Sequence, residues 1–364
     1  MAEPRAAVAR ARRVVLKIGS RTLADDRAIF DSLAATIAAH PRASFVVVSS
    51  GAIALGVKKL GYRARPKEMA KLQAAAAAGQ SLLMRAYEEA FAARGLSVAQ
   101  VLLTHADLAD RARANNARAA LGALLEAGAV PILNENDSVA VDEIEDRFGD
   151  NDQLAAMVAP LVDAQLVVLL SDVEGLLDRK GQRVRVVRDV PTDALPHIRE
   201  SGGAVGSGGM ASKVEAARRA TLAGANVVVA DARAPGTLDA VLAGEDVGTL
   251  FVAARNRLSA KKYWIAFTLR PRGDLVLDRG AARAVRAKGK SVLSVGVLGV
   301  RGDFRAGDAV RVVDADGLEI ARGIARCSAG DASVVAGKAR EDLSPEMAGL
   351  AVVIHADELV VGHT

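Results

Sequence analysis

The chain has 364 residues, of which 51% are hydrophobic, 25% charged and 3% aromatic, and this ordinary composition excludes a disordered or collagen-like protein. Its 48 basic and 43 acidic side chains give a formal net charge of +5 and are spread along the chain. The single cysteine, Cys327, excludes a disulfide framework and a thiolate metal cage. We expect a cytoplasmic protein without membrane segments, since no apolar run approaches the roughly 18 residues of a span.

The first 13 residues carry four arginines and no apolar segment of the kind found in a secretory signal. We interpret them as a short basic arm that precedes the first strand.

Up to about Thr249, short apolar runs alternate with longer Ala- and Leu-rich stretches at helical spacing. The predicted strands are 14–16, 45–48, 98–103, 130–133, 166–170 and 227–230. The predicted helices are 29–37, 68–93, 116–126, 154–161 and 214–222. Fully apolar strands separated by helices are typical of a parallel sheet that is covered on both faces. The sequence therefore predicts an α/β domain, a doubly wound and mainly parallel sheet sandwiched by helices.

The pattern changes after Thr249 to short strand-like pieces separated by turns. These pieces are 275–277, 294–298, 309–313 and 334–335. The segment 314–317, Asp-Ala-Asp-Gly, lies between two apolar runs and is typical of a hairpin. We expect a first domain at 1–258, a linker at 259–272, a small and mostly β domain at 273–350, and a C-terminal tail at 351–364.

Ligands of α/β sheets bind beyond the carboxyl ends of the strands, so the polar residues that follow each strand are candidates for a binding site. Lys17, close to Gly19, suits a phosphate oxygen, although a solvated lysine would explain it as well. Ser50 precedes Gly51 at the start of a helix, where either an anion site or a plain serine cap is expected.

Further polar residues follow the later strands. The segment 134–137, Asn-Glu-Asn-Asp, offers donors for a carboxylate and acceptors for an ammonium group, or alternatively forms a simple turn. Asp152 could cap the next helix, or the two acids Asp150 and Asp152 could hold lysines or a magnesium complex. Ser171 with Asp172, and Asp231, follow two other strands and could contact a nucleotide.

A glycine-rich run at 202–209 leads into a helix that contains Lys213. Backbone N–H groups at such a helix start could bind phosphates, and Lys213 could reach the transferred one. Gly206, Gly208 and Ala211 also fit a dinucleotide fingerprint formally, but the polar segment before them is not the strand that this fingerprint requires. The chain has no Gly-x-Ser-x-Gly motif, and its five histidines have no metal-ligand spacing.

Read in order, the segments 17–20, 49–52, 134–137, 149–152, 171–172 and 206–210 resemble those of the glutamate 5-kinases, a family of the amino acid kinase superfamily. Residues 273–350 resemble the PUA domain of bacterial members, so the resemblance covers nearly the whole chain. It implies an amino acid kinase fold. It also implies transfer of the γ-phosphoryl group of ATP, with Mg²⁺, to the γ-carboxylate of L-glutamate in the first step of proline biosynthesis.

The resemblance also implies roles for individual residues. Lys17 and Lys213 would flank the transferred phosphoryl group, and Asp152 would hold both lysines. The glutamate-binding residues would be Ser50, Asp137, Asn151 and Asn134. The ATP-binding residues would be Lys17, Ser171, Asp172, Ser207, Gly208, Gly209, Met210, Ala211, Ser212 and Lys213. No side chains are assigned as ligands of a metal ion.

As partners, the resemblance implies proline as an inhibitor, a homodimer or homotetramer, and a glutamyl phosphate reductase. Three alternatives stay open: another kinase of the superfamily acting on N-acetylglutamate, aspartate or UMP, an RNA-binding or RNA-modifying protein, and a nicotinamide dehydrogenase. Residues 273–350 hold 12 basic and 11 acidic side chains, which argues against nucleic acid.

Overall fold

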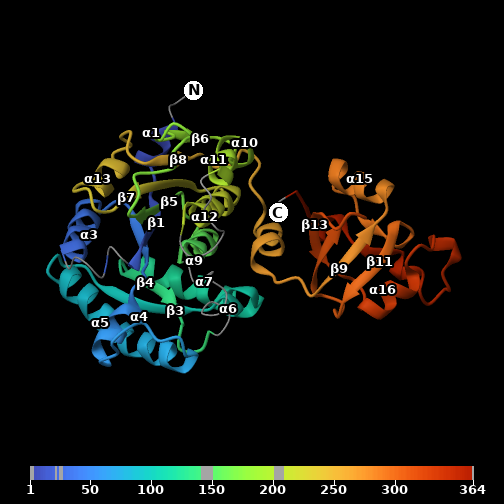
Figure 1. The fold of residues 1–364 in the computed structure, drawn as a ribbon, viewed down its shortest axis with the longest axis horizontal. Coiled ribbons are helices and arrows are strands. Elements are labelled where there is room, and N and C mark those ends of the chain that lie inside the picture. The colour runs from blue at the N-terminus through green and yellow to red at the C-terminus, as the bar shows by residue number, and fades with distance from the viewer. Residues whose placement is uncertain (1–3, 21–22, 24–27, 141–150, 201–208, 363–364) are drawn as a thin grey trace. The chain divides into compact units, whose positions relative to one another are not determined.

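The computed structural model describes residues 4–20, 23, 28–140, 151–200 and 209–362. The chain forms two compact units, Met1–Arg257 and Leu258–Thr364 (Figure 1). None of the helices in the described ranges is long and apolar enough to cross a membrane.

The first unit is built on a sheet of eight strands in the order β3-β4-β2-β1-β5-β7-β8-β6. All neighbouring strands are parallel except β7 and β8, which are antiparallel. The strands are β1 (Arg13–Ile18), β2 (Ser44–Val48), β3 (Val98–Leu103), β4 (Val130–Glu135), β5 (Leu166–Ser171), β6 (Val186–Val187), β7 (Asn226–Asp231) and β8 (Thr249–Phe251). The predicted α/β class is therefore confirmed.

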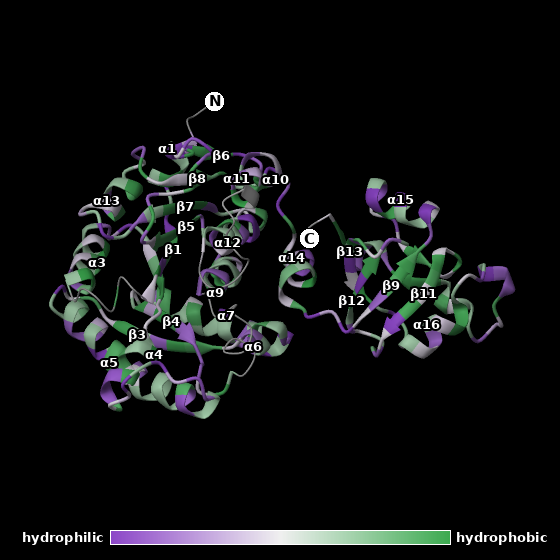
Figure 2. Cartoon of the chain, in the orientation of Figure 1, coloured by the Kyte–Doolittle hydropathy of each residue, from purple (hydrophilic) through white to green (hydrophobic). Residues whose placement is uncertain are grey.

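Helices cover both faces of this sheet (Figure 1). They are α1 (Pro4–Ala9), α3 (Ala28–Ala39), α4 (Ala52–Lys59), α5 (Met69–Ala92), α6 (His105–Ala109), α7 (Arg111–Glu126), α9 (Asn151–Val158), α10 (Val190–Asp193), α11 (Leu195–Glu200), α12 (Met210–Ala223) and α13 (Thr237–Leu242), with a short 3₁₀ helix η1 (Ala159–Leu161) after α9. Side chains alternate across a strand, so Val14 and Leu16 of β1 pack with α3, α5 and α13, whereas Val15 packs with α7, α9 and α12. Figure 2 shows the apolar strands between these helices.

Several elements extend further than the apolar pattern predicts, and the extensions bring polar residues into regular structure. Helix α9 begins at Asn151, so Asp152 lies in its first turn. Helix α7 begins at Arg111, because the Asp110 side chain accepts a hydrogen bond from the backbone N–H of Arg113 at 2.9 Å. Strand β4 runs on to Glu135, so the polar end of this strand belongs to the sheet and not to a following turn.

Strand β1 lies at the point where the order of the sheet reverses, with β2 on one side and β5 on the other. The connections that leave the two sides of such a switch point diverge and open a crevice beyond the carboxyl ends of the strands. Lys17 is the penultimate residue of β1 and therefore lies at this crevice.

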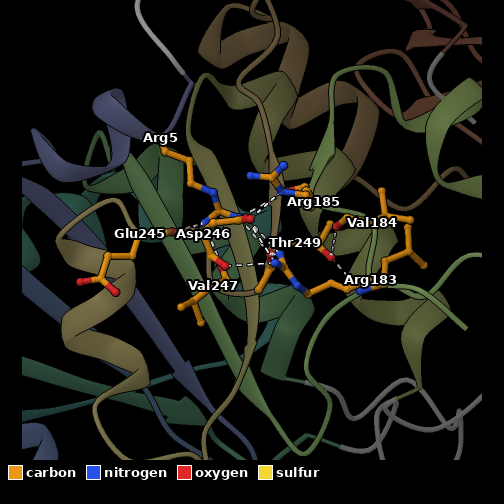
Figure 3. A network of polar contacts seen from close by, with 10 residues as sticks. Arg5, Arg183, Val184, Arg185, Glu245, Asp246, Val247 and Thr249 are labelled. Atoms are coloured by element: carbon orange, nitrogen blue, oxygen red, sulfur yellow. Dashed lines mark hydrogen bonds and ion pairs between the residues drawn. The ribbon is translucent and has the colours of Figure 1, made fainter.

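Arg5 does not lie in a free basic arm, because residues 4–9 form the helix α1. Arg5 of α1 is buried, and its guanidinium donates to the carbonyls of Arg185, Glu245, Val247 and Gly248 (Figure 3). It also pairs with Asp246 at 3.2 Å, which in turn contacts Arg183 and Arg185. A guanidinium can satisfy this many acceptors because it carries five N–H donors, so Arg5 anchors α1 to the edge of the sheet.

The second unit has a five-stranded sheet in the order β11-β9-β12-β13-β15 and a two-stranded sheet of β10 and β14. The strands are β9 (Gly273–Leu277), β10 (Val292–Leu293), β11 (Val297–Gly302), β12 (Ala309–Val313), β13 (Glu319–Ile324), β14 (Val352–Ile354) and β15 (Leu359–Val361). The helices are α14 (Ala260–Tyr263), the π-helix η2 (Trp264–Thr268), α15 (Arg279–Lys288), α16 (Ala329–Val335) and four short 3₁₀ helices, η3 (Ser294–Gly296), η4 (Arg340–Asp342), η5 (Ala348–Ala351) and η6 (Ala356–Glu358). The predicted hairpin at 314–317 is confirmed, since it joins the antiparallel strands β12 and β13.

Two local predictions in this unit are wrong. Residues 334–335 are not a strand but the end of α16, because Ser328 caps a helix by accepting from the backbone N–H of Asp331 at 3.1 Å. Residues 294–296 form the 3₁₀ helix η3, and the strand begins only at Val297.

The expected linker and tail also differ from the structure. Residues 260–268 are helical and belong to the second unit. Within the expected tail, β14 pairs with β10 and β15 pairs with β13. Val353, Ile354 and Leu359 are buried in the core of this unit, which explains why these short strands belong to the domain.

Candidate functional site

One buried carboxylate contacts two buried lysines at the carboxyl end of β1. Lys17 Nζ lies 2.6 Å from Asp152 Oδ1, and Lys213 Nζ lies 3.0 Å from Asp152 Oδ2. All three side chains are buried. Two ammonium groups lie on either side of one carboxylate, which concentrates positive charge at this end of the strand. The arrangement therefore favours an anion, and it brings together the three residues predicted to be catalytic.

Three different elements supply these groups. Lys17 comes from β1, Asp152 from the first turn of α9 and Lys213 from the first turn of α12. Gln153 fixes the two helices to each other, because its Nε2 donates to the carbonyl of Ser212 at 3.1 Å. The first turn of α12 carries partial positive charge from its free N–H groups and adds to the attraction for an anion.

A chain of side-chain amides lies beside the lysine pair. Asn151 Nδ2 donates to Ser50 Oγ at 2.9 Å, to Asn134 Oδ1 at 3.0 Å and to the carbonyl of Ser49. Asn134 Nδ2 in turn donates to Gln80 Oε1 at 2.9 Å. Three of the predicted substrate-binding residues, at positions 50, 134 and 151, are thus joined in one network.

A pocket of about 290 Å³ lies next to this network. It is lined by Ala52, Ala76, Ala77, Gln80, Ser81, Gln100, Leu102, Glu135, Asn136, Asp137 and Ser138. Burial raises the pKa of Asp137 to about 6, while the positive charge of Arg65 acts in the opposite direction. The pocket has the size of a small-molecule site, and two carboxylates in its wall suit an ammonium group.

Sequence reasoning missed the contribution of α5. Gln80 lines the pocket, and the Tyr87 hydroxyl lies 2.9 Å from Ser49 Oγ. These two residues are seven positions apart and therefore lie on one face of the helix. The polar side chains on this face of the Ala-rich, 24-residue helix α5 could have indicated that it contributes to the site.

The residues predicted to bind the nucleotide lie at the ends of β5 and β7 and at the start of α12. Ser171 ends β5, and its hydroxyl donates to Asp172 Oδ1 at 3.2 Å. Arg233 pairs with Asp231 at 2.9 Å, which lowers the pKa of that carboxyl, and donates to the carbonyl of Asp172 at 2.7 Å.

The glycine-rich run is described only from its end. Gly209 precedes the first turn of α12, which contains the predicted Met210, Ala211 and Ser212. Ser207 and Gly208 lie outside the described residues. In the described part of the chain before this run, residues 190–200 form α10 and α11. The strand that a dinucleotide fingerprint needs is therefore not found there.

The protein resembles known kinases along nearly its whole length. A family model described as "Amino acid kinase family" matches residues 12–231, and one described as "PUA domain" matches residues 273–343. The glutamate 5-kinase of Myxococcus xanthus (strain DK1622) is 46% identical over 98% of each chain. That of Chromohalobacter salexigens is 45% identical over 98% of each chain. The one from Pseudomonas putida (strain W619) is 43% identical over 98% of this chain and 100% of that one.

The chain belongs to the glutamate 5-kinase family. Membership makes the protein a kinase with a C-terminal PUA domain, and the family predicted from the ordered motifs is confirmed. Among solved structures, that of an isopentenyl phosphate kinase covers 66% of this chain at 17% identity, with a TM-score of 0.46.

Proposed function

We propose that this member of the glutamate 5-kinase family transfers the γ-phosphoryl group of ATP to the γ-carboxylate of L-glutamate. The products are L-glutamyl 5-phosphate and ADP, and the reaction is the first step of proline biosynthesis. The observation that carries the proposal is the buried Asp152 carboxylate, which holds the Lys17 and Lys213 ammonium groups in one place. An acidic pocket for an amino group adjoins the same amide network.

The chemistry needs positioning and positive charge and no general base. The γ-carboxylate of glutamate is ionised at neutral pH, so one of its oxygens attacks the γ-phosphorus directly. A new P–O bond forms while the bond to the β,γ-bridging oxygen breaks, and ADP leaves with that electron pair. Lys17 and Lys213 would stabilise the charge on the equatorial oxygens during transfer. Asp152 accepts from both ammonium groups and thereby keeps them in position.

The pocket residues account for recognition of an amino acid. Asp137 would accept from the α-ammonium group, and Ser50, Asn134 and Asn151 would bind the remaining polar atoms of glutamate. Because hydrogen bonds already join the last three residues, their side chains are oriented before substrate arrives.

The nucleotide would bind at the ends of β5 and β7, with Ser171 and Asp172 as contacts and residues 207–213 around the phosphates. Within the described ranges, no group of three or more His, Cys, Asp or Glu residues could hold a metal ion. Both Asp152 oxygens contact lysines. Mg²⁺ would arrive as the MgATP complex, in which phosphate oxygens and waters supply most of its ligands.

Family membership supports four further proposals about the protein in the cell. Proline would inhibit the enzyme, the chain would form a homodimer or homotetramer, a glutamyl phosphate reductase would take up the product, and the reaction would occur in the cytoplasm. The near balance of 12 basic and 11 acidic side chains in residues 273–350 favours a regulatory or assembly role for the PUA domain over RNA binding.

The deciding experiment measures ADP release with MgATP and L-glutamate in the presence of hydroxylamine, which traps an acyl phosphate as γ-glutamyl hydroxamate. We expect equal amounts of ADP and hydroxamate, and neither from a Lys213→Ala preparation purified in parallel. Release of ADP without hydroxamate would contradict the proposal, and N-acetylglutamate, aspartate and UMP would then be compared as acceptors.

A further inference from the structure

Gln80 lies in the wall of the acidic pocket and also forms the end of the amide chain that reaches Asn151. We propose that it is a further specificity-determining residue, whose Nε2 donates a hydrogen bond to the α-carboxylate of the acceptor amino acid. The proposal rests on the proposed function and assigns one more contact to that site.

The hydrogen bonds determine which way the Gln80 amide points. The backbone N–H of Glu135 can only donate, and it donates to Asn134 Oδ1 at 3.0 Å. The other end of the Asn134 side chain is therefore Nδ2, which donates to Gln80 Oε1 at 2.9 Å. Since Oε1 is engaged there, the group left over at Gln80 is the Nε2 donor.

This donor is buried and, among the described residues, has no acceptor. A buried N–H group without a partner is costly, and such groups in native proteins commonly await a water, an ion or a ligand. Gln80 lines the pocket, so a ligand bound there lies against this residue, and a small movement of the amide would bring its Nε2 to an acceptor atom of the ligand. A substrate oxygen would complete the hydrogen bonds of the amide chain.

The chemistry of the pocket selects the α-carboxylate from the two carboxylates of glutamate. The α-ammonium and the α-carboxylate are bonded to the same carbon, so the groups that bind them must share one pocket. Asp137 and Gln80 line one pocket, and they offer an acceptor for the ammonium group and a donor for the carboxylate. The γ-carboxylate is then free to face the lysine pair, where transfer occurs.

Two variants at position 80 separate this role from a structural one. Gln80→Glu keeps an oxygen for Asn134 but replaces the donor, whereas Gln80→Met removes both groups at similar size. Gln73→Glu is the matched control, because it makes the same replacement on the same helix at a residue that does not line the pocket. KM for L-glutamate, KM for ATP and kcat are measured with the hydroxamate assay.

We expect both Gln80 variants to raise KM for glutamate by about 10- to 100-fold, as for a lost hydrogen bond to a charged group, with KM for ATP and kcat changed less than threefold. Gln73→Glu should change KM for glutamate less than threefold. An unchanged KM for glutamate, an equal rise in KM for ATP, or an equal effect of Gln73→Glu would overturn the proposal. Wild-type protein that forms no hydroxamate would instead refute the proposed function.

A crystal structure with L-glutamate bound gives a direct and independent test. Gln80 Nε2 within hydrogen-bonding distance of an α-carboxylate oxygen would support the assignment. An α-carboxylate bound elsewhere would overturn it, even if the kinase activity is established.

Discussion

Gly56 of α4 and Gly79 of α5 contact each other where the two helices cross. A Cβ atom on Gly79 would lie 2.6 Å from the Gly56 nitrogen and 1.8 Å from the carbonyl oxygen of Ala52, and one on Gly56 would lie 1.7 Å from the carbonyl oxygen of Ala75. Only glycine allows the two backbones to approach so closely. The crossing matters for function because α4 and α5 both line the acidic pocket.

We expect Gly79→Ala to lower the free energy of unfolding by about 1–3 kcal/mol or more, the range for overpacking, because backbone atoms would have to move. Urea unfolding measures the change. KM for glutamate should rise as well, since Gln80 is the next residue. The matched control is Gly122→Ala in the helix α7, where a Cβ would meet nothing within 4 Å. That variant should gain about 0.5–1 kcal/mol from helix propensity. Equal losses from both substitutions would contradict the steric explanation.

Lys17→Ala and Lys213→Ala should each lower kcat by about 10²–10⁴-fold, judged from the loss of single groups that stabilise transition-state charge. Initial rates of ADP release at saturating substrates measure the effect. A loss below threefold at either position would contradict its assignment to the transferring phosphoryl group.

Asp152→Asn should destabilise the protein more than either lysine variant. Removing one lysine leaves the carboxylate with the other lysine, whereas removing the carboxylate takes away the charge that lies between two buried ammonium groups. The expected loss is about 3–5 kcal/mol, as for breaking a buried ion pair by removal of one partner. Denaturant unfolding of the three variants side by side measures the order, and a smaller loss for Asp152→Asn than for Lys213→Ala would refute this charge balance.

Ionisation of Asp137 should make the affinity for glutamate depend on pH. Its pKa of about 6 in the folded protein lies above the usual aspartate value of 3.8, so its ionised form, which binds the ammonium group, is lost as the pH falls through about 6. KM for glutamate should be roughly tenfold higher at pH 5 than at pH 8, because at pH 5 the Asp137 carboxyl must lose its proton before it can bind the ammonium group. In Asp137→Asn, KM should be high and nearly independent of pH over this range. The raised pKa also means that this group favours the folded state most below pH 4, and that this contribution declines as the pH rises through 6.

Arg5→Ala should reduce stability by about 2–3 kcal/mol, because four carbonyls and Asp246 lose a charged donor in a largely buried place. Thermal and urea unfolding measure the loss. Arg10→Ala is the control, since Arg10 is exposed, and it should stay within about 0.5 kcal/mol of wild type. Similar effects at both positions would indicate that net charge, and not the anchoring contacts, is responsible.

The apolar pattern predicted six strands of the first unit, β1, β2, β3, β4, β5 and β7, because most of them are short and continuous apolar runs, as in residues 166–170. It could not predict Gln80, whose role depends on a hydrogen bond to Asn134, 54 positions away. Burial of Arg5 was equally hidden, since its partners lie about 240 positions along the chain. In the second unit, helix α16 was missed because a serine cap decides the conformation of a short Ala- and Val-rich segment. Strands β14 and β15 were missed because three residues carry too little pattern to distinguish a strand from a tail.

The length of β4 reduces the conformational entropy that the protein loses when substrate binds. Asn134 and Glu135 are paired with Leu102 and Leu103 of β3, so their backbones belong to the sheet ladder. A loop at this position would lose conformational freedom when it closed on a ligand, at a cost of about 1–2 kcal/mol for each residue fixed. Residues already held in a ladder lose almost none. The contacts between the protein and the acceptor amino acid then determine the affinity. A substitution that makes this wall of the pocket more rigid should improve the affinity little.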